Sequence, residues 1–122
     1  MTSRNVAEFF DSLTGEYTET IERCFPRYPE MLWAVVNYLP PGRQFENILE
    51  LGAGTGNLSV AIHQAYPAAT LRVVDVSRES LDICRERLSG GEQLICDDTD
   101  FRDLQFDANS FDLIVSLSLI HI

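Results

Sequence analysis

The sequence contains no lysine, and all nine of its basic residues are arginines. Against 19 acidic residues they leave a formal net charge of −10. A surface with this charge repels phosphate backbones, so we expect no general affinity for nucleic acid, although a local cluster of arginines could form an exception.

The sequence also lacks long apolar runs and a regular set of cysteines. No apolar stretch approaches the roughly 20 residues that span a bilayer, and residues 1–4 do not begin a segment of signal-peptide type. We therefore expect no contact with a membrane. Cys24, Cys84 and Cys96 are far apart and odd in number. This favours free thiols in a cytoplasmic protein over a disulfide framework or a metal site.

What the sequence does contain is enough apolar material, 45% of 122 residues, for one domain with a core. Residues 1–45 predict helices, the last of them over 29–39, which ends before Pro40 and Pro41. From residue 46 apolar strands alternate with helices, which indicates an α/β fold with a buried parallel sheet. The predicted strands are 47–51, 70–74, 92–96 and 111–117, and the predicted helices between them are 57–66 and 77–88.

Three glycines follow the first of these strands at a spacing of two: Gly52, Gly54 and Gly56. Without Cβ atoms the backbone can turn sharply there and approach a ligand closely. The helix that follows directs its free N–H groups at the same place. The spacing G-x-G-x-G differs from the G-x-G-x-x-G of dinucleotide sites, which disfavours a nicotinamide-binding domain. Glu50, just before the glycines, suits a cationic ligand better than a pyrophosphate. A glycine turn in another kind of α/β protein is the plain alternative.

The run from Glu50 to Gly56 resembles motif I (E/D-x-G-x-G-x-G) of the class I S-adenosylmethionine-dependent methyltransferases. The resemblance implies a Rossmann-like three-layer sandwich with a parallel sheet of about four strands in the order 3-2-1-4. It also implies S-adenosylmethionine as the cofactor, held at the glycine loop, where Ala53 and Asn57 would take part.

Two further stretches match cofactor motifs of this family. Asp75, followed by Val76, closes the second strand, where the family holds the ribose hydroxyls; a helix-capping acid is the alternative. After the third strand the family pairs an acid with the adenine amino group. Asp100 and Phe101 match this position best, and Asp98 is the second choice. Because four acids fall within seven residues, a solvated acidic loop stays open as well.

Residues 110–116 match the family's fourth motif, whose strand end faces the methyl group, so Ser116 is a further cofactor-lining candidate. His121 follows it as a candidate base, or as a histidine with no catalytic role. In the N-terminal helical cover, Tyr17 could reach the cofactor or could serve core packing alone.

The family domain normally has seven strands, whereas this sequence ends after the fourth. We therefore expect the N-terminal, cofactor-binding part of the family fold, as a single domain over residues 1–122 with a helical cover (1–45) and a βαβ core (46–122). Strand 4 would form a long, flat, apolar edge, which predicts a homodimer or a partner chain; an excised fragment of a longer enzyme is the alternative.

Two functions remain from the sequence. The first is methyl transfer from S-adenosylmethionine to a small-molecule acceptor. The second is a module that binds the cofactor or its product without catalysis of its own.

Overall fold

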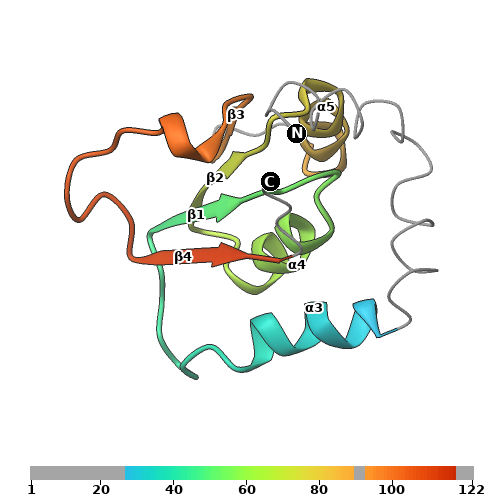
Figure 1. Cartoon of the computed structure of the whole chain (residues 1–122). Coiled ribbons are helices and arrows are strands. Elements are labelled where there is room, and N and C mark those ends of the chain that lie inside the picture. Colours follow the sequence, from blue (N-terminus) through green and yellow to red (C-terminus); the bar gives the residue numbers. More distant parts are fainter. Residues whose placement is uncertain (1–26, 90–92, 118–122) are drawn as a thin grey trace.

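The structure is a computed structural model that describes residues 27–89 and 93–117 (Figure 1). Its centre is a four-stranded sheet in which every pairing is parallel and the strand order is β3-β2-β1-β4. The strands are β1 (Asn47–Leu51), β2 (Thr70–Val74), β3 (Leu94–Asp97) and β4 (Leu113–Ser116). The predicted sheet, its order and its parallel direction are confirmed.

Three α-helices lie on one face of this sheet. Helices α4 (Asn57–Ala65) and α5 (Arg78–Arg87) are the crossover connections after β1 and β2, and they pack against the sheet and each other. Helix α3 (Tyr28–Asn37) packs against α4 on the side of β4 (Figure 1). Within the described residues, no helix combines the length and apolar character that crossing a membrane requires.

Local signals in the sequence explain where these helices begin. The Ser77 hydroxyl accepts the Ser80 N–H at 3.2 Å, which makes Ser77 the N-cap of α5, as predicted. Helix α4 begins instead at Gly56, which has a left-handed φ of 96° and no capping side chain. A Cβ atom on Gly56 would lie 2.8 Å from the Cys84 sulfur on α5. Gly56 therefore allows the turn into α4 and also lets α4 and α5 approach each other.

The core lies between the sheet and the helices. Residues that pair across parallel strands point to the same face. Ile48 pairs with Leu71 and with Leu113, and Leu71 pairs with Leu94, so one layer of apolar side chains crosses all four strands. The residues of this core cluster are Phe45, Ile48, Ala53, Leu58, Ile62, Ala69, Leu71, Val73, Leu81, Cys84, Leu94 and Val115.

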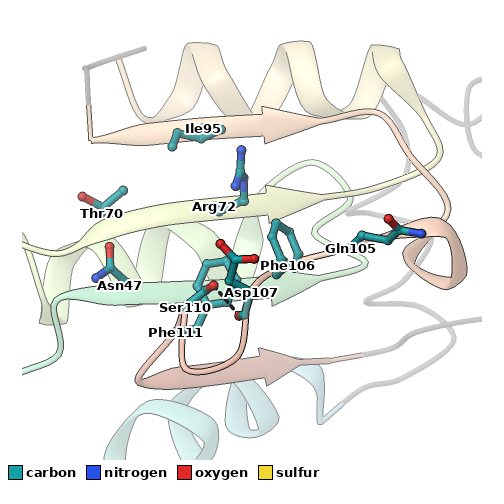
Figure 2. Close-up of a pocket in the computed structure, with 9 residues that line it drawn as sticks. All are labelled: Asn47, Thr70, Arg72, Ile95, Gln105, Phe106, Asp107, Ser110 and Phe111. Carbon is teal, nitrogen blue, oxygen red and sulfur yellow. Dashed lines mark hydrogen bonds between the residues drawn. The ribbon is translucent and has the colours of Figure 1, made fainter.

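The opposite face carries the chain that connects β3 to β4. After the short 3-10 helix η1 (Phe101–Asp103), residues 105–111 run back across the sheet (Figure 2). The rings of Phe106 and Phe111 meet edge to face at 4.9 Å, and the Arg72 guanidinium lies 5.2 Å from the Phe106 ring centre. The Nε atom of Arg72 is 2.9 Å from a carboxylate oxygen of Asp97, an ion pair whose geometry does not make a hydrogen bond.

Two strand boundaries differ from those predicted. Strand β3 covers 94–97 rather than 92–96, and β4 covers 113–116 rather than 111–117. The predicted long β4 edge is therefore wrong, because the strand has only four residues. Asp112 explains its late start: its carboxylate accepts the Glu46 N–H (2.7 Å) and the Asn47 N–H (2.9 Å). The Asp112 side chain thus binds the backbone where β1 begins, and its own N–H donates to the Asn47 carbonyl oxygen at 3.0 Å.

Asp112 gives a prediction about acid stability. Burial alone would raise its pKa, but the backbone N–H groups of Glu46, Asn47 and Asp112 itself, together with the positive charge of Arg43, outweigh burial and lower it. A lowered pKa adds stability above the ordinary value of 3.8, and this stability is lost as pH falls through the folded-state pKa. We expect Asp112→Ala to cost about 1 kcal/mol at pH 7, and the difference from the parent to shrink toward pH 3. Urea titrations at both pH values measure this, with Asp107→Ala as the control.

Gly56 gives a second prediction, for which Gly42 is a matched control. Both have positive φ, but an added Cβ meets nothing within 4 Å at Gly42. We expect Gly42→Ala to cost about 1–2 kcal/mol from backbone strain, and Gly56→Ala to cost roughly 1–3 kcal/mol more from overpacking. Urea denaturation followed by circular dichroism measures both. In a Cys84→Ala background the extra loss should shrink; equal losses for the two glycines would contradict the packing argument.

Candidate cofactor-binding site

The glycine loop connects β1 to α4 at the carboxyl ends of the strands. Gly52, Gly54 and Gly56 have φ values of 70°, 58° and 96°, a region that residues with side chains seldom adopt. The N–H groups of Gly52 and Ala53 both donate to the Val74 carbonyl oxygen, at 2.8 and 3.1 Å. The loop is therefore fixed to the end of β2, in the conformation that the glycine spacing predicts.

Asp75, immediately after β2, joins this loop to α5. One oxygen of its carboxylate accepts the Gly54 N–H at 2.8 Å, and the other accepts the Ser77 N–H at 2.8 Å. The Asp75 N–H donates to the Asp97 carbonyl oxygen at the end of β3. The bond to Ser77 shows that the capping role left open by the sequence exists, in addition to the contact with the loop.

The other strand ends bring further predicted residues to the same edge of the sheet. Ser116 ends β4, and its hydroxyl donates to the Leu51 carbonyl oxygen at 3.0 Å. Asp98 follows β3, and Val76 lies half-buried beside Asp75. Asn57 opens α4. Since the strands are parallel, their carboxyl ends place these residues around the glycine loop. Tyr17 and His121 lie outside the described residues, and their roles stay predictions.

The acid predicted for the adenine position is paired within its own turn. Asp100 is only 9% exposed and caps η1, which begins at Phe101. Its carboxylate accepts the backbone N–H of Arg102 at 2.9 Å and the Arg102 guanidinium at 2.6 Å. Asp100 is therefore not part of a solvated acidic loop, and a ligand amino group would share this carboxylate with Arg102.

Glu50 lies beneath the glycine loop and not on its outer surface. Its side chain is 1% exposed, points toward the helices and accepts the Ser59 hydroxyl at 2.5 Å. Burial raises the pKa of Glu50 to about 8, although the Ser59 bond lowers it; the nearby Asp75 charge adds to the rise. Glu50 is therefore mostly neutral at pH 7. This position does not support the direct charge contact with a cationic ligand that the sequence suggested.

Sequence reasoning missed the residues that support the loop from behind. Arg87, in the last turn of α5, donates from Nη1 to the Thr55 carbonyl oxygen (3.0 Å) and to the Asn57 side-chain oxygen (2.8 Å). Cys84 lies buried one turn earlier, and burial raises the pKa of its thiol to about 11. One signal was available: Ser59 is a polar residue on the apolar face of the predicted helix.

A separate cavity of about 360 Å³ lies away from this edge, where β1 and β2 begin (Figure 2). Its walls come from the sheet face that carries residues 105–111, and its lining residues are Asn47, Thr70, Arg72, Ile95, Gln105, Phe106, Asp107, Ser110 and Phe111. None of the residues predicted to bind a cofactor lines it.

Comparison with known proteins shows the family to which this chain belongs. The sequence profile of the methyltransferase domain family matches residues 48–122. A demethylmenaquinone methyltransferase of Clavibacter sepedonicus is 39% identical over 111 residues, which are 89% of this chain and 44% of that protein. The chain spans half or less of the length of the first curated relatives that it matches.

Solved structures share the fold at lower identity. The [4+2]-cyclase SpnF superposes with a TM-score of 0.70 at 15% identity, over 93% of this chain and 48% of the cyclase. Phosphoethanolamine N-methyltransferase 2 of Haemonchus contortus, in complex with phosphomonomethylethanolamine and S-adenosylhomocysteine, gives a TM-score of 0.61 at 21% identity, over 71% of this chain and 20% of that protein. With the profile match over residues 48–122, the glycine loop and the strand order, the chain belongs to the methyltransferase domain family, within the class I S-adenosylmethionine-dependent methyltransferases.

Proposed function

We propose that this chain binds S-adenosylmethionine at the carboxyl edge of the sheet and serves methyl transfer to a small-molecule acceptor. One observation carries the proposal: three positive-φ glycines form a loop whose Gly54 N–H is bonded to the strand-end carboxylate of Asp75. A loop without Cβ atoms allows a ligand close to the backbone, and a carboxylate at its side can accept hydrogen bonds from a cis-diol.

The residues around the loop fit the parts of this cofactor. Gly52–Gly56 and the N-terminus of α4 would hold the amino-acid part, and Asp75 with Val76 the ribose. The adenine would lie toward Asp98 and the turn at Asp100 and Phe101. Ser116, which ends β4 beside Leu51, would border the sulfur end. These roles follow the family motifs, and the placement of the residues at one edge of the sheet supports them.

The protein's main contribution to such a reaction is positioning. The bound cofactor supplies an activated methyl group on a sulfonium. The chain must then hold acceptor and methyl group in line and close, which lowers the barrier without a strong acid or base. The names of the quinone and phosphoethanolamine methyltransferases described above refer to small acceptors, which supports a small-molecule acceptor for this chain.

A cofactor-binding module without catalysis of its own is the second candidate. It is favoured because the candidate residues that the structure describes all concern the cofactor, and none forms an acceptor site. The cyclase with the same fold shows further that this architecture alone does not determine the chemistry. Formation of S-adenosylhomocysteine that depends on an added acceptor, such as a demethylquinone, separates the two candidates.

We further propose that β4 pairs with another strand, from a second copy or a partner chain. We also propose that the protein is located in the cytoplasm. Among the described residues β4 pairs with β1 alone, and Ile114 is 60% exposed. Cys84 and Cys96 are free thiols, as expected in a reducing compartment. Light scattering after size exclusion should give more than the monomer mass, and Ile114→Lys should restore the monomer. A monomer at high concentration would contradict self-pairing.

The cofactor site is tested by calorimetric titration with S-adenosylhomocysteine. We expect one-to-one binding by the parent chain and binding weakened about 10- to 100-fold by Asp75→Ala, because hydrogen bonds to a charged group are lost. Asp75→Asn keeps the size of the side chain and should lose affinity while the fold is preserved. Asp107→Ala, at the other edge of the sheet, should bind as the parent does.

Two outcomes would contradict this function. Folded parent chain that binds no S-adenosylhomocysteine would exclude a working cofactor site. Saturable binding of NAD that S-adenosylhomocysteine cannot displace would favour the nicotinamide-binding alternative.

A further inference from the structure

A row of buried polar side chains crosses beneath the glycine loop. Glu50 on β1, Ser59 on α4 and Cys84 on α5 are exposed by 1%, 0% and 0%, respectively. These three elements carry the loop or support it. The Ser59 hydroxyl bonds to Glu50, and both residues lie close enough to the Cys84 thiol to influence its pKa. The row therefore connects the strand before the loop to both helices behind it.

The bond between Glu50 and Ser59 spans the loop itself. Glu50 precedes Gly52 by two residues, and Ser59 follows Gly56 by three. The 2.5 Å contact between their side chains therefore fixes the spacing between the end of β1 and the first turn of α4. Any change in this contact changes the distance over which the loop must close.

The surroundings of Glu50 favour its neutral form. Glu50 pairs with Val73 on β2 and with Val115 on β4, which are both apolar. The charge that affects its pKa is the negative one of Asp75, just after β2. Cys84 on α5 is a neutral thiol, and the hydroxyl of Ser59 on α4 donates a hydrogen bond that lowers the pKa of Glu50 by less than burial raises it. Of the three arginines on α5 (Arg78, Arg85 and Arg87), Arg87 bonds to the loop at the Thr55 carbonyl oxygen and the Asn57 side chain, and not to Glu50. Among the residues that the structure describes, no cation contributes to the pKa of Glu50, so an ionised carboxylate would stay buried beside the negative charge of Asp75.

We propose that Glu50 is a positioning residue for the cofactor loop: bonded to Ser59, the neutral acid holds β1 and α4 at the spacing that binds the S-adenosyl ligand, and ionisation weakens that binding because it buries a second negative charge next to Asp75, which bonds to the loop at Gly54. The inference rests on the proposed function, since it concerns the same site. It assigns to the motif acid a role in shaping the loop, in place of a charge contact with the ligand.

The proposal has a defined pH dependence. The folded-state pKa of Glu50, about 8, exceeds the ordinary value of 4.5. The acid therefore contributes stability that is fully present below pH 4.5 and is lost as pH rises through about 8. If only the neutral form binds well, the apparent dissociation constant grows as the neutral fraction falls, by about tenfold at pH 9.

The test compares the parent chain with Glu50→Gln, which mimics the neutral acid permanently. Calorimetry gives the affinities of both proteins for S-adenosylhomocysteine at pH 6.5 and pH 9.0. We expect equal binding at pH 6.5 and about tenfold weaker binding by the parent at pH 9.0. Protonation changes of the ligand affect both proteins equally, so they cancel in the ratio of the two dissociation constants at each pH. Without ligand, the melting temperature of the parent should fall relative to that of Glu50→Gln as pH rises from 5 to 8.

The charged ligand separates this role from a charge contact. If ionised Glu50 attracted the sulfonium, S-adenosylmethionine would gain affinity for the parent as pH rises, and Glu50→Gln would bind it poorly at every pH. Either result, or a parent-to-variant ratio that does not change with pH, overturns the proposal. If folded parent and variant both fail to bind S-adenosylhomocysteine at pH 6.5, the proposed function itself fails, and this inference with it.

Ser59→Ala provides a second variant that keeps the acid. Because the Ser59 bond lowers the pKa of Glu50, its removal should move the pH at which affinity falls to a higher value. The lost spacing contact should weaken binding at all pH values. An unchanged affinity and pH midpoint would overturn the proposal even if Glu50→Gln did not fold.

Discussion

Two hydrogen bonds to one carbonyl oxygen organise this structure: the N–H groups of Gly52 and Ala53 both donate to Val74. They join the turn after β1 to the last residue of β2, so the two central strands end at the same level. Asp75 then lies beside Gly54, and Ser77 is in place to cap α5. The described residues assigned to the cofactor site depend on this alignment of the strand ends. They lie at the ends of the strands, just after them, or in the loop after β1.

Features with a local cause could be predicted from the sequence. The turn at Gly52–Gly56 and the cap at Ser77 depend on residues within a few positions of each other, and the strand order followed from the family resemblance. The start of β4 could not be predicted, because Asp112 bonds to Glu46 and Asn47, some 65 residues earlier in the sequence. The state of Glu50 could not either. Its motif shows an acid, whereas burial, with a smaller contribution from the Asp75 charge, raises the pKa of Glu50 and favours its neutral form, although the Ser59 bond acts in the opposite direction.

The fold and the chemistry are specified by different parts of such a protein. A methyltransferase and a [4+2]-cyclase share this architecture at low identity. The loop, Asp75 and the row beneath it would serve equally any reaction of a bound S-adenosyl ligand. The fold alone therefore does not determine which reaction such a protein catalyses.

The guanidinium of Arg87 has a consequence for conformational entropy. Its Nη1 atom bonds both to a backbone oxygen of the loop and to the Asn57 side chain at the start of α4. The loop is thus ordered by the last turn of α5 before any ligand arrives. The entropy of fixing a glycine-rich turn, which is larger than for other residues, is lost during folding rather than during binding. A ligand that bound here would meet a loop that is already ordered, and more of its contact energy would be available as affinity.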